Sequence, residues 1–355
     1  MRKFQFVSDA VATQYKPLIG HSISELESFA ESLDEKPFRG RQLFDWIYRQ
    51  QVDDFSKMTD LSKSLREKLS KVSTHPLKML NREESLSKQT RKFLFEVSGG
   101  KMIESVLMKE GNRTTVCLST QVGCAVDCDF CATAKMGFVK NLTAGEIVDQ
   151  FLQLQKISDQ KITNVVFMGM GEPFLNYKNS IAAADLLHHP RGINMGAWRV
   201  TISTAGVAHK IKQFSDEGHP YKLAVSLNGS TQNQRLKTMP ITKVYSFSDL
   251  IKTSKDYAYH SRNRVTFEYV LLDGVNDDPQ DAEKLNRLLN SIDCKLNVIP
   301  YNEIGGPYRR PPDIRIKAFL HPLKKASFPV TVRWSKGQDI DAGCGQLATH
   351  LEKVE

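Results

Sequence analysis

The sequence predicts an α/β fold: a partial, TIM-like (β/α)6 barrel with a small helical N-terminal domain. From Thr114 onward, short runs rich in β-branched residues alternate with amphipathic stretches of helical length. Strands separated by such helices pair in parallel, because a parallel connection needs a crossover. In barrels of this kind the chemistry gathers at the carboxyl ends of the strands. The 355 residues suffice for one large domain and a smaller companion.

The N-terminal residues predict short helices joined by polar turns. Ser24 followed by Glu27 resembles a capping box that opens the first helix. Pro37 opens a second helix, PFRGRQLFDWIYRQ, in which apolar residues recur at helical spacing. A third helix is predicted from Leu61 to Val72.

Strand-like alternation begins near residue 90. The runs KFLFEV and KMIESVLMKE flank a Gly-Gly turn, and TTVCLST follows them. A helix is expected over residues 144–157. The later strands are NVVFM, RVTIS, YKLAVSL, RVTFEYVLL, KLNVIP and PVTVRW. We therefore expect a helical N-terminal accessory domain with a short β linker over residues 1–95 and a barrel over residues 96–355.

Composition narrows the class of protein. Lys and Arg total 49 against 40 for Asp and Glu, a net charge of +9 that favours a polyanionic partner such as nucleic acid. No apolar run reaches the roughly 20 residues that cross a bilayer. The N-terminus lacks the apolar core and cleavage site of a signal peptide. A cytoplasmic protein with no membrane association is expected.

Three cysteines are clustered in CAVDCDFC, directly after a predicted strand. Cys124, Cys128 and Cys131 can each bind one iron of a 4Fe–4S cluster, which leaves the fourth iron open. An open iron can chelate the amino and carboxylate groups of S-adenosylmethionine (SAM) and pass an electron to its sulfonium. Structural zinc is the alternative, but it needs four ligands, commonly in two pairs. Haem attachment needs a His where Ala132 stands.

Small or polar residues follow several predicted strands. After NVVFM comes the loop GMGEP, whose glycines allow a ligand to approach the backbone closely. The other strand ends could bind the ribose or the amino acid part of SAM, although each such residue could instead cap the next helix. The candidates are Gly171, Glu172, Ser203, Ser226, Leu227, Asn228 and Asn302.

The remaining cysteines and one carboxylate differ in context. Cys344 lies between glycines, which indicates a mobile and accessible thiol, whereas a structural cysteine usually has apolar neighbours. Cys117 lies in the strand before the cluster and could simply be buried there, and Cys294 is expected in the core. Glu104 shares a strand face with apolar residues, which makes it a candidate proton acceptor. An edge-strand Glu paired with Lys or Arg is the alternative.

These motifs together resemble a known family. Cys-x3-Cys-x2-Cys with Phe130 before the last cysteine is the radical SAM signature. The wider segment QVGCAVDCDFCATAKMGFVKNLTAGEI is similar to the radical SAM adenine-C2 methyltransferases that modify 23S ribosomal RNA and transfer RNA. Further matches, from about residue 22 to about residue 350, are PFRGRQLFDWIY, MGMGEP, RVTISTAGV, VSLNGS, EYVLLDGVND, NVIPYN and DIDAGCGQL.

The resemblance implies a reaction that uses SAM twice. One SAM methylates Cys344, and a second yields a 5′-deoxyadenosyl radical that takes a hydrogen from the S-methylcysteine. The resulting methylene radical adds to carbon 2 of adenine, and Cys117 frees the product through a transient disulfide with Cys344. Glu104 or Cys117 takes the carbon-2 proton. One 4Fe–4S cluster, an electron donor such as flavodoxin or ferredoxin, and a monomeric enzyme are also implied.

Some alternatives stay open. Many relatives have His where Asn228 stands, although Asn can still donate and accept hydrogen bonds. Enzymes that methylate carbon 8 share the cysteines but tend to have Ala in place of Pro173, so Pro173 favours carbon 2. A non-catalytic Fe–S or zinc RNA-binding protein is the rival from another class.

Two basic segments are candidate RNA contacts. Arg39, Arg41 and Arg49 surround an aromatic-rich helix, and the loop Tyr308-Arg309-Arg310-Pro311 follows a barrel strand. Both could instead be solvated surface, with Phe44, Ile47 and Tyr48 in the core.

Overall fold

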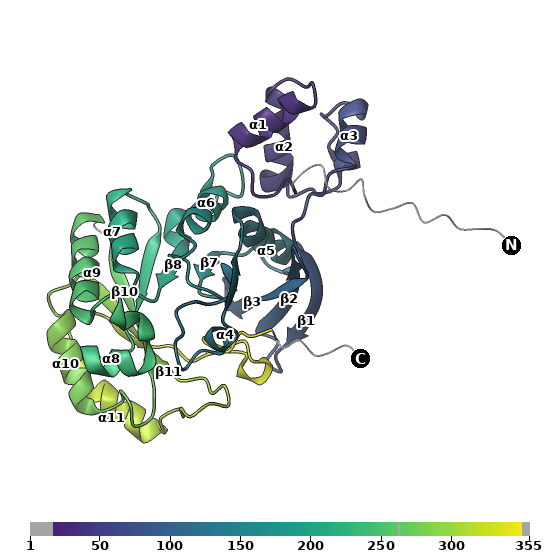
Figure 1. Cartoon of the computed structure of the whole chain (residues 1–355). Helices are drawn as coiled ribbons and strands as arrows, with labels where there is room; N and C mark the ends of the chain where they lie inside the picture. Colours follow the sequence, from purple (N-terminus) through teal and green to yellow (C-terminus); the bar gives the residue numbers. More distant parts are fainter. Residues whose placement is uncertain (1–16, 262, 350–355) are drawn as a thin grey trace.

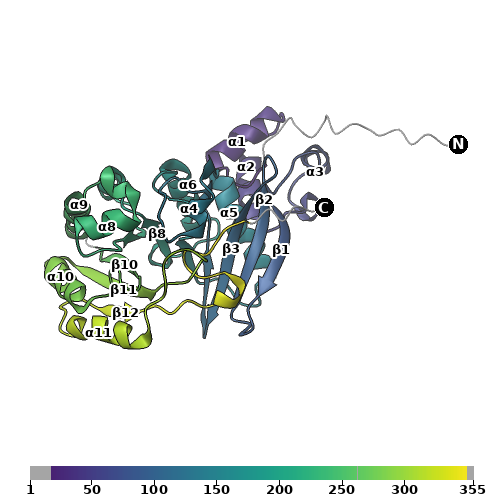
Figure 2. The same ribbon diagram turned by 60° about the horizontal axis from the view of Figure 1, so that its bottom comes forward.

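The computed structural model describes residues 17–261 and 263–349, in which ten strands form one open, curved sheet (Figures 1 and 2). The strand order is β1-β2-β3-β4-β7-β8-β9-β10-β11-β12. Three helices and a π-helical turn precede the sheet and form a separate lobe beside it (Figure 1). No helix within these ranges is long and apolar enough to span a membrane.

The N-terminal lobe contains α1 (Ile23–Ser32), α2 (Phe38–Phe44), the π-helical turn η2 (Asp45–Arg49) and α3 (Lys63–Leu69). The capping box predicted at Ser24 and Glu27 is wrong. The helix starts two residues earlier, and Ser22 and Glu25 form the box, with the Glu25 carboxylate accepting from Ser22 N–H at 2.7 Å. Glu27 instead forms an ion pair with Arg41 on α2.

Four antiparallel strands form one side of the sheet: β1 (Lys78–Glu84), β2 (Thr90–Val97), β3 (Lys101–Glu110) and β4 (Arg113–Cys117). The sequence did not predict β1, because its side chains are almost all exposed, most of them are charged, and they give no apolar alternation. Residue 95 lies inside β2, so the sheet is continuous across the expected domain boundary.

The parallel part of the sheet confirms the predicted partial barrel. In the described residues, β4 is followed by six further parallel strands. They are β7 (Asn164–Phe167), β8 (Val200–Thr204), β9 (Lys222–Ser226), β10 (Val265–Leu271), β11 (Cys294–Pro300) and β12 (Val330–Val332).

Helices cover the outer face of this curved sheet (Figure 2). They are α5 (Ala144–Ile157), α6 (Tyr177–His188), α7 (Ala208–Asp216), α8 (Gln232–Thr238), α9 (Phe247–Ser261), α10 (Pro279–Leu289) and α11 (Asp313–Leu323). Alternate strand residues such as Phe167, Phe267 and Leu296 are fully buried against the helices. Cys294 is also buried there, as predicted.

Candidate active site

The predicted site residues lie at one end of the sheet, at the carboxyl ends of the parallel strands. Cys117 ends β4, Ser203 lies at the end of β8, and Ser226 ends β9. Glu172 follows β7 and Asn302 follows β11. Because all these strands run in the same direction, their ends form one mouth, as the sequence predicted.

The cysteine loop projects from this mouth on a small hairpin that the sequence did not predict. β5 (Gln121–Gly123) pairs with β6 (Phe138–Asn141), and Cys124 N–H donates to the Gly137 carbonyl at 2.9 Å. A Cβ on Gly123 would lie 1.7 Å from that carbonyl oxygen, so only glycine allows the hairpin to close. Phe130 anchors the far side of the loop in an apolar cluster with residues of β10 and β11.

The donor set of the loop fits a cluster. Cys124, Cys128 and Cys131 are unpaired and half-buried, and no group of three or more His, Cys, Asp or Glu in the described chain is arranged around a single ion. A 4Fe–4S cube does not need such convergence, because each thiolate binds a different iron. Burial raises the pKa of Cys124 to about 12 and that of Cys128 well above its usual value. The thiolates therefore need a positive centre to stabilise them.

Glu172 joins two of the strand ends. Its carboxylate accepts from Phe174 N–H at 2.9 Å and from Ala205 N–H at 2.5 Å, which ties the loop after β7 to the loop after β8. Burial raises the pKa of Glu172 to about 7. Gly171 adopts φ +98°, and a Cβ there would lie 2.5 Å from the side chain of Gln121. The glycines of GMGEP thus serve close packing.

Asn228 follows β9 in the left-handed conformation (φ +52°), which Asn tolerates better than most residues. Its side-chain amide oxygen, Oδ1, accepts from Val270 N–H at 2.7 Å. Behind it, the fully buried Arg235 donates to the carbonyls of Leu227 at 3.1 Å and Ser226 at 3.3 Å, and to Ala205. Arg235 thereby organises the ends of β8 and β9, a role that the sequence did not predict.

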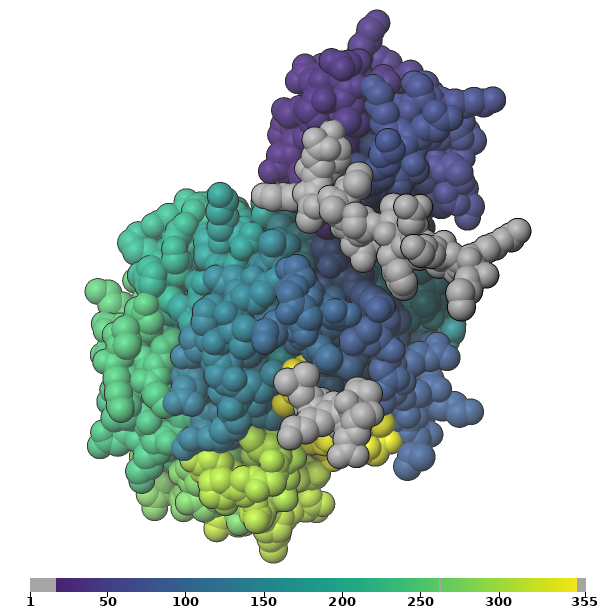
Figure 3. Space-filling view, turned by 45° about the vertical axis from the view of Figure 1, so that its right-hand side comes forward, coloured from purple at the N-terminus to yellow at the C-terminus, as the bar shows by residue number. Residues whose placement is uncertain are grey.

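The C-terminal segment folds back over the mouth, visible in yellow in Figure 3. Asn302 donates to the Cys344 carbonyl at 3.0 Å, and Ala132 N–H donates to the Gly345 carbonyl at 2.7 Å. Thr133 also donates to the Leu347 carbonyl at 2.5 Å. The loop with Cys344 is therefore bound directly to the helix that follows the cluster cysteines.

Cys344 and Cys117 lie close enough to interact electrostatically. Cys344 is exposed to solvent, yet the neighbouring atoms desolvate its thiol enough to raise its pKa to about 11. Burial raises the pKa of Cys117 to about 12, and the Cys344 thiol adds to the rise. Arg333, just after β12, opposes the rise at both thiols. Cys344 also interacts electrostatically with Cys131, so one thiol faces both the cluster loop and the strand cysteine.

Glu104 is buried and has two partners. One carboxylate oxygen lies 3.2 Å from Lys92 Nζ, and the other accepts from Ala348 N–H at 3.1 Å. Burial raises the pKa of Glu104, while Lys92 opposes the rise. The pairing with a lysine that the alternative interpretation gave is present, although β3 is an inner strand and not an edge strand. The second contact attaches β3 to the C-terminal segment.

Arg333 and Glu268 are site residues that sequence analysis missed. Glu268 on β10 interacts with Cys344 and accepts from Asn297 at 2.9 Å, and its Oε2 has no hydrogen-bond partner in the described structure. A carboxylate inside the apolar run EYVLL was a usable signal. Arg333 gave no such signal, because basic residues are common directly after strands.

The predicted RNA contacts are surface arginines with local partners. Arg39, Arg41 and Arg49 form ion pairs with Glu35, Glu27 and Asp45. Between them Phe44 and Tyr48 are buried and Trp46 is partly buried. Arg310 stacks on Trp334 at 4.7 Å, and Tyr308 donates to Asp129 in the cysteine loop at 3.3 Å. The loop Tyr308–Pro311 thus lies beside the mouth.

Comparisons with known proteins agree with this geometry. Residues 17–74 match the N-terminal domain of the ribosomal RNA large subunit methyltransferases, and residues 118–285 match the radical SAM superfamily. A dual-specificity RNA methyltransferase RlmN of Thermotoga neapolitana is 44% identical and covers 94% of this chain and 97% of its own. A dual-specificity RNA methyltransferase RlmN of Leptospira interrogans is 42% identical, and the match covers 95% of this chain and 97% of the relative.

A solved structure shares the whole fold. The crystal structure of a radical SAM methyltransferase from Sphaerobacter thermophilus is 41% identical, with a TM-score of 0.90, and covers 94% of this chain and 99% of that one. These relatives confirm the resemblance seen in the motifs. The chain therefore belongs to the RlmN family of radical SAM RNA methyltransferases.

Proposed function

We propose that this enzyme methylates carbon 2 of an adenosine in 23S ribosomal RNA and of an adenosine next to the anticodon in transfer RNAs, through S-methylcysteine at Cys344. The observation that supports this most strongly is the meeting of Cys344, Cys117 and the cluster loop at one mouth. A thiol placed between a strand cysteine and the cluster loop can meet two reaction partners in turn.

Cys124, Cys128 and Cys131 would hold a single 4Fe–4S cluster, which when bound supplies the electron that cleaves SAM. SAM would lie against the strand ends, and two molecules would be used per turnover. Its contacts would be Gly171, Glu172, Ser203, Ser226, Leu227, Asn228 and Asn302. The side chains of Asn228 and Asn302 already bind neighbouring groups, so both would also shape the pocket.

The protein's own groups carry the methyl transfer. The Cys344 thiolate attacks the methyl carbon of SAM, a C–S bond forms, and S-adenosylhomocysteine leaves. Arg333 favours that thiolate, because it opposes the pKa rise caused by burial. After the methylene carbon has bonded to carbon 2, the adduct would lose one electron to the bound cluster and the carbon-2 proton to a base. Cys117 then attacks the Cys344 sulfur: a disulfide forms, the bond between that sulfur and the methylene carbon breaks, and the released carbon takes up a proton to become the methyl group. Glu104 or Cys117 would take the proton from carbon 2.

The RNA base must leave its stack to reach this mouth. We assign the helical lobe within residues 1–95 to RNA binding and residues 96–355 to the catalytic barrel. The loop Tyr308–Pro311 would contact RNA beside the cluster. The enzyme would act as a cytoplasmic monomer and take electrons from a donor such as flavodoxin or ferredoxin.

Mass spectrometry of the product tests the position of methylation. Protein reconstituted anaerobically should convert both RNAs to a product containing 2-methyladenosine, while cleaving SAM to methionine and 5′-deoxyadenosine. Finding the isomer 8-methyladenosine instead would show that the enzyme methylates carbon 8. RNA binding without SAM cleavage would instead favour a non-catalytic RNA-binding protein.

SAM affinity should depend on pH through Glu172. Only the ionised carboxylate is charged and accepts hydrogen bonds at both oxygens, and its pKa is about 7 in the protein without SAM. If it also accepts from the SAM amino group, affinity should fall as pH is lowered through 7, by up to about tenfold per unit. Equilibrium binding to the reconstituted enzyme from pH 6 to 8 measures this.

The Glu172→Gln variant is the control, because it keeps the side-chain shape and does not titrate. It should bind SAM more weakly, with a smaller dependence on pH. Any pH dependence of SAM affinity that remains in the variant reports the titration of SAM itself. Equal slopes in the wild type and the variant would show that Glu172 only joins the two loops.

A further inference from the structure

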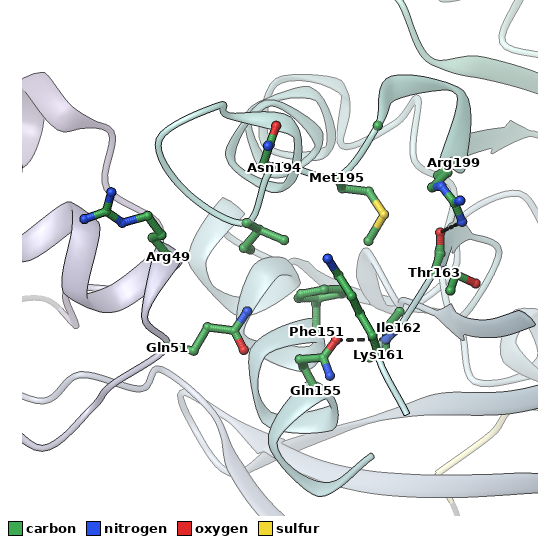
Figure 4. Close-up of a pocket in the computed structure, with 12 residues that line it drawn as sticks. Arg49, Gln51, Phe151, Gln155, Lys161, Ile162, Thr163, Asn194, Met195 and Arg199 are labelled. Carbon is green, nitrogen blue, oxygen red and sulfur yellow. Dashed lines mark hydrogen bonds between the residues drawn. The ribbon is translucent and has the colours of Figure 1, made fainter. Parts of the chain in front are cut away.

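A cavity lies at the amino ends of the parallel strands, the end of the sheet opposite the cysteines. Figure 4 is a close-up of this cavity. Its volume is about 330 Å³, at the lower end of the usual range for small-ligand sites. Thr163 and Arg199, which line it, directly precede β7 and β8 and so stand at the amino ends of the strands. The lobe, α5 and the loop before β8 complete the wall, with Arg49, Gln51, Phe151, Gln155, Lys161, Ile162, Ile193, Asn194, Met195 and Gly196.

The cavity is cationic. Its lining includes Arg49, Lys161 and Arg199 and no Asp or Glu. Arg49 has a carboxylate within reach, Asp45 at 3.5 Å. Lys161 is exposed and has no hydrogen bond or ion pair with any described residue, and Figure 4 shows its ammonium group directed toward the cavity. An unpaired ammonium group at the opening of a cavity that no carboxylate lines favours an anionic ligand.

Neutral donors accompany this charge. The side-chain amides of Gln51 and Asn194 form no hydrogen bond within the described structure, and both residues line the cavity. Both also have left-handed backbones, with φ of +55° and +56°, so each sits at a sharp turn. Amides and an ammonium group are the donors that proteins use toward phosphate oxygens.

An exposed aromatic ring stands at the rim. Trp198 is 59% exposed, and the Arg199 guanidinium lies 4.2 Å from its ring centroid. A Cβ added to Gly196, which lines the cavity, would lie 3.0 Å from the Trp198 indole nitrogen, so the ring adjoins the opening. Lys222 adds a cation 5.8 Å from the ring centroid. An aromatic plane beside cations is typical of surfaces that bind unstacked nucleotides.

We propose that this cavity and Trp198 bind a nucleotide of the RNA substrate outside the catalytic mouth. A phosphate would lie against Lys161 and the two amides, and a base would pack on Trp198. This rests on the proposed function for the identity of the RNA. Strands of four or five residues separate the two ends of the sheet, a distance of roughly 13 to 17 Å. A folded RNA whose adenosine enters the mouth can therefore extend along the barrel to this site.

Salt-dependent RNA binding tests the site. Fluorescence anisotropy with labelled substrate RNA and the reconstituted enzyme should show Lys161→Glu weakening binding about tenfold, with the slope of log K against log salt reduced by about one. Trp198→Ala should weaken binding about tenfold with the slope unchanged, because stacking releases no counterions. Lys161→Arg should restore binding, which separates lost charge from lost folding.

Lys252→Glu is the matched control, since it reverses an exposed charge on α9, a helix that does not line the cavity. Equal effects of the two Lys→Glu changes would overturn the proposal. The proposal would also be overturned if the Lys161→Glu variant still bound RNA but no longer bound free AMP. The ligand of the cavity would then be a free nucleotide. Wild-type protein that binds RNA but methylates none would defeat the proposed function and leave this comparison valid.

Discussion

Alanine in place of Cys124, Cys128 or Cys131 is expected to abolish SAM cleavage and RNA methylation. Each thiol would bind a different iron, and the rest of the described loop offers no substitute, because no further His, Cys, Asp or Glu group is arranged around an ion there. Single variants should lose the brown colour and the absorbance at about 400 nm that such clusters show. Iron and sulfide analysis after anaerobic reconstitution gives an independent measure.

Cys294→Ala provides a matched control. That cysteine is buried in the barrel wall, and its thiol donates only to the Leu289 carbonyl at 3.8 Å. The variant should lose a little stability and keep the full iron content. A triple variant at the three cluster positions that still bound a complete cluster would contradict the assignment of ligands.

Much of the fold was predictable, because local patterns determine strands that are buried on both faces. The runs NVVFM, RVTIS and KLNVIP are apolar and β-branched, and each forms a parallel strand near the expected position. β1 escaped prediction because an exposed strand has no apolar period. The first cap was misplaced by two residues because two Ser-x-x-Glu matches overlap there, and only tertiary contacts separate them.

The site was predictable in position but not in its contacts. Parallel topology alone places Glu172, Ser203 and Asn302 at one edge of the sheet. Their partners depend on packing between distant segments, as with Asn302 and the Cys344 carbonyl, 42 residues apart. No local pattern reports such a contact. Arg333 was missed for the same reason, since its effect arises only where Cys117 and Cys344 meet.

Cys117→Ala should trap RNA on the enzyme, whereas Cys344→Ala should prevent any attachment. Cys344 would accept the methyl group, so Cys344→Ala protein should carry no S-methylcysteine and leave RNA unmodified. Cys117 would act only after the methylene carbon has bonded to carbon 2, so its variant should still form that bond. Without a thiol beside Cys344, the bond between that carbon and the Cys344 sulfur should persist. Denaturing gels should then show a shifted, RNase-sensitive band.

The double variant Cys117→Ala with Cys344→Ala shows whether the RNA in the shifted band is attached through Cys344. It should give no adduct, because the attachment point is gone, and mass spectrometry of the single variant should place the nucleotide on the peptide that contains Cys344. A purely structural Cys117 predicts something different. Its side chain is 8% exposed in a packed strand, so truncation would lower the thermal midpoint and the yield and trap no RNA. A well-folded Cys117→Ala enzyme that turns over without an adduct would exclude the resolving role, because no other described cysteine besides the cluster ligands interacts with Cys344.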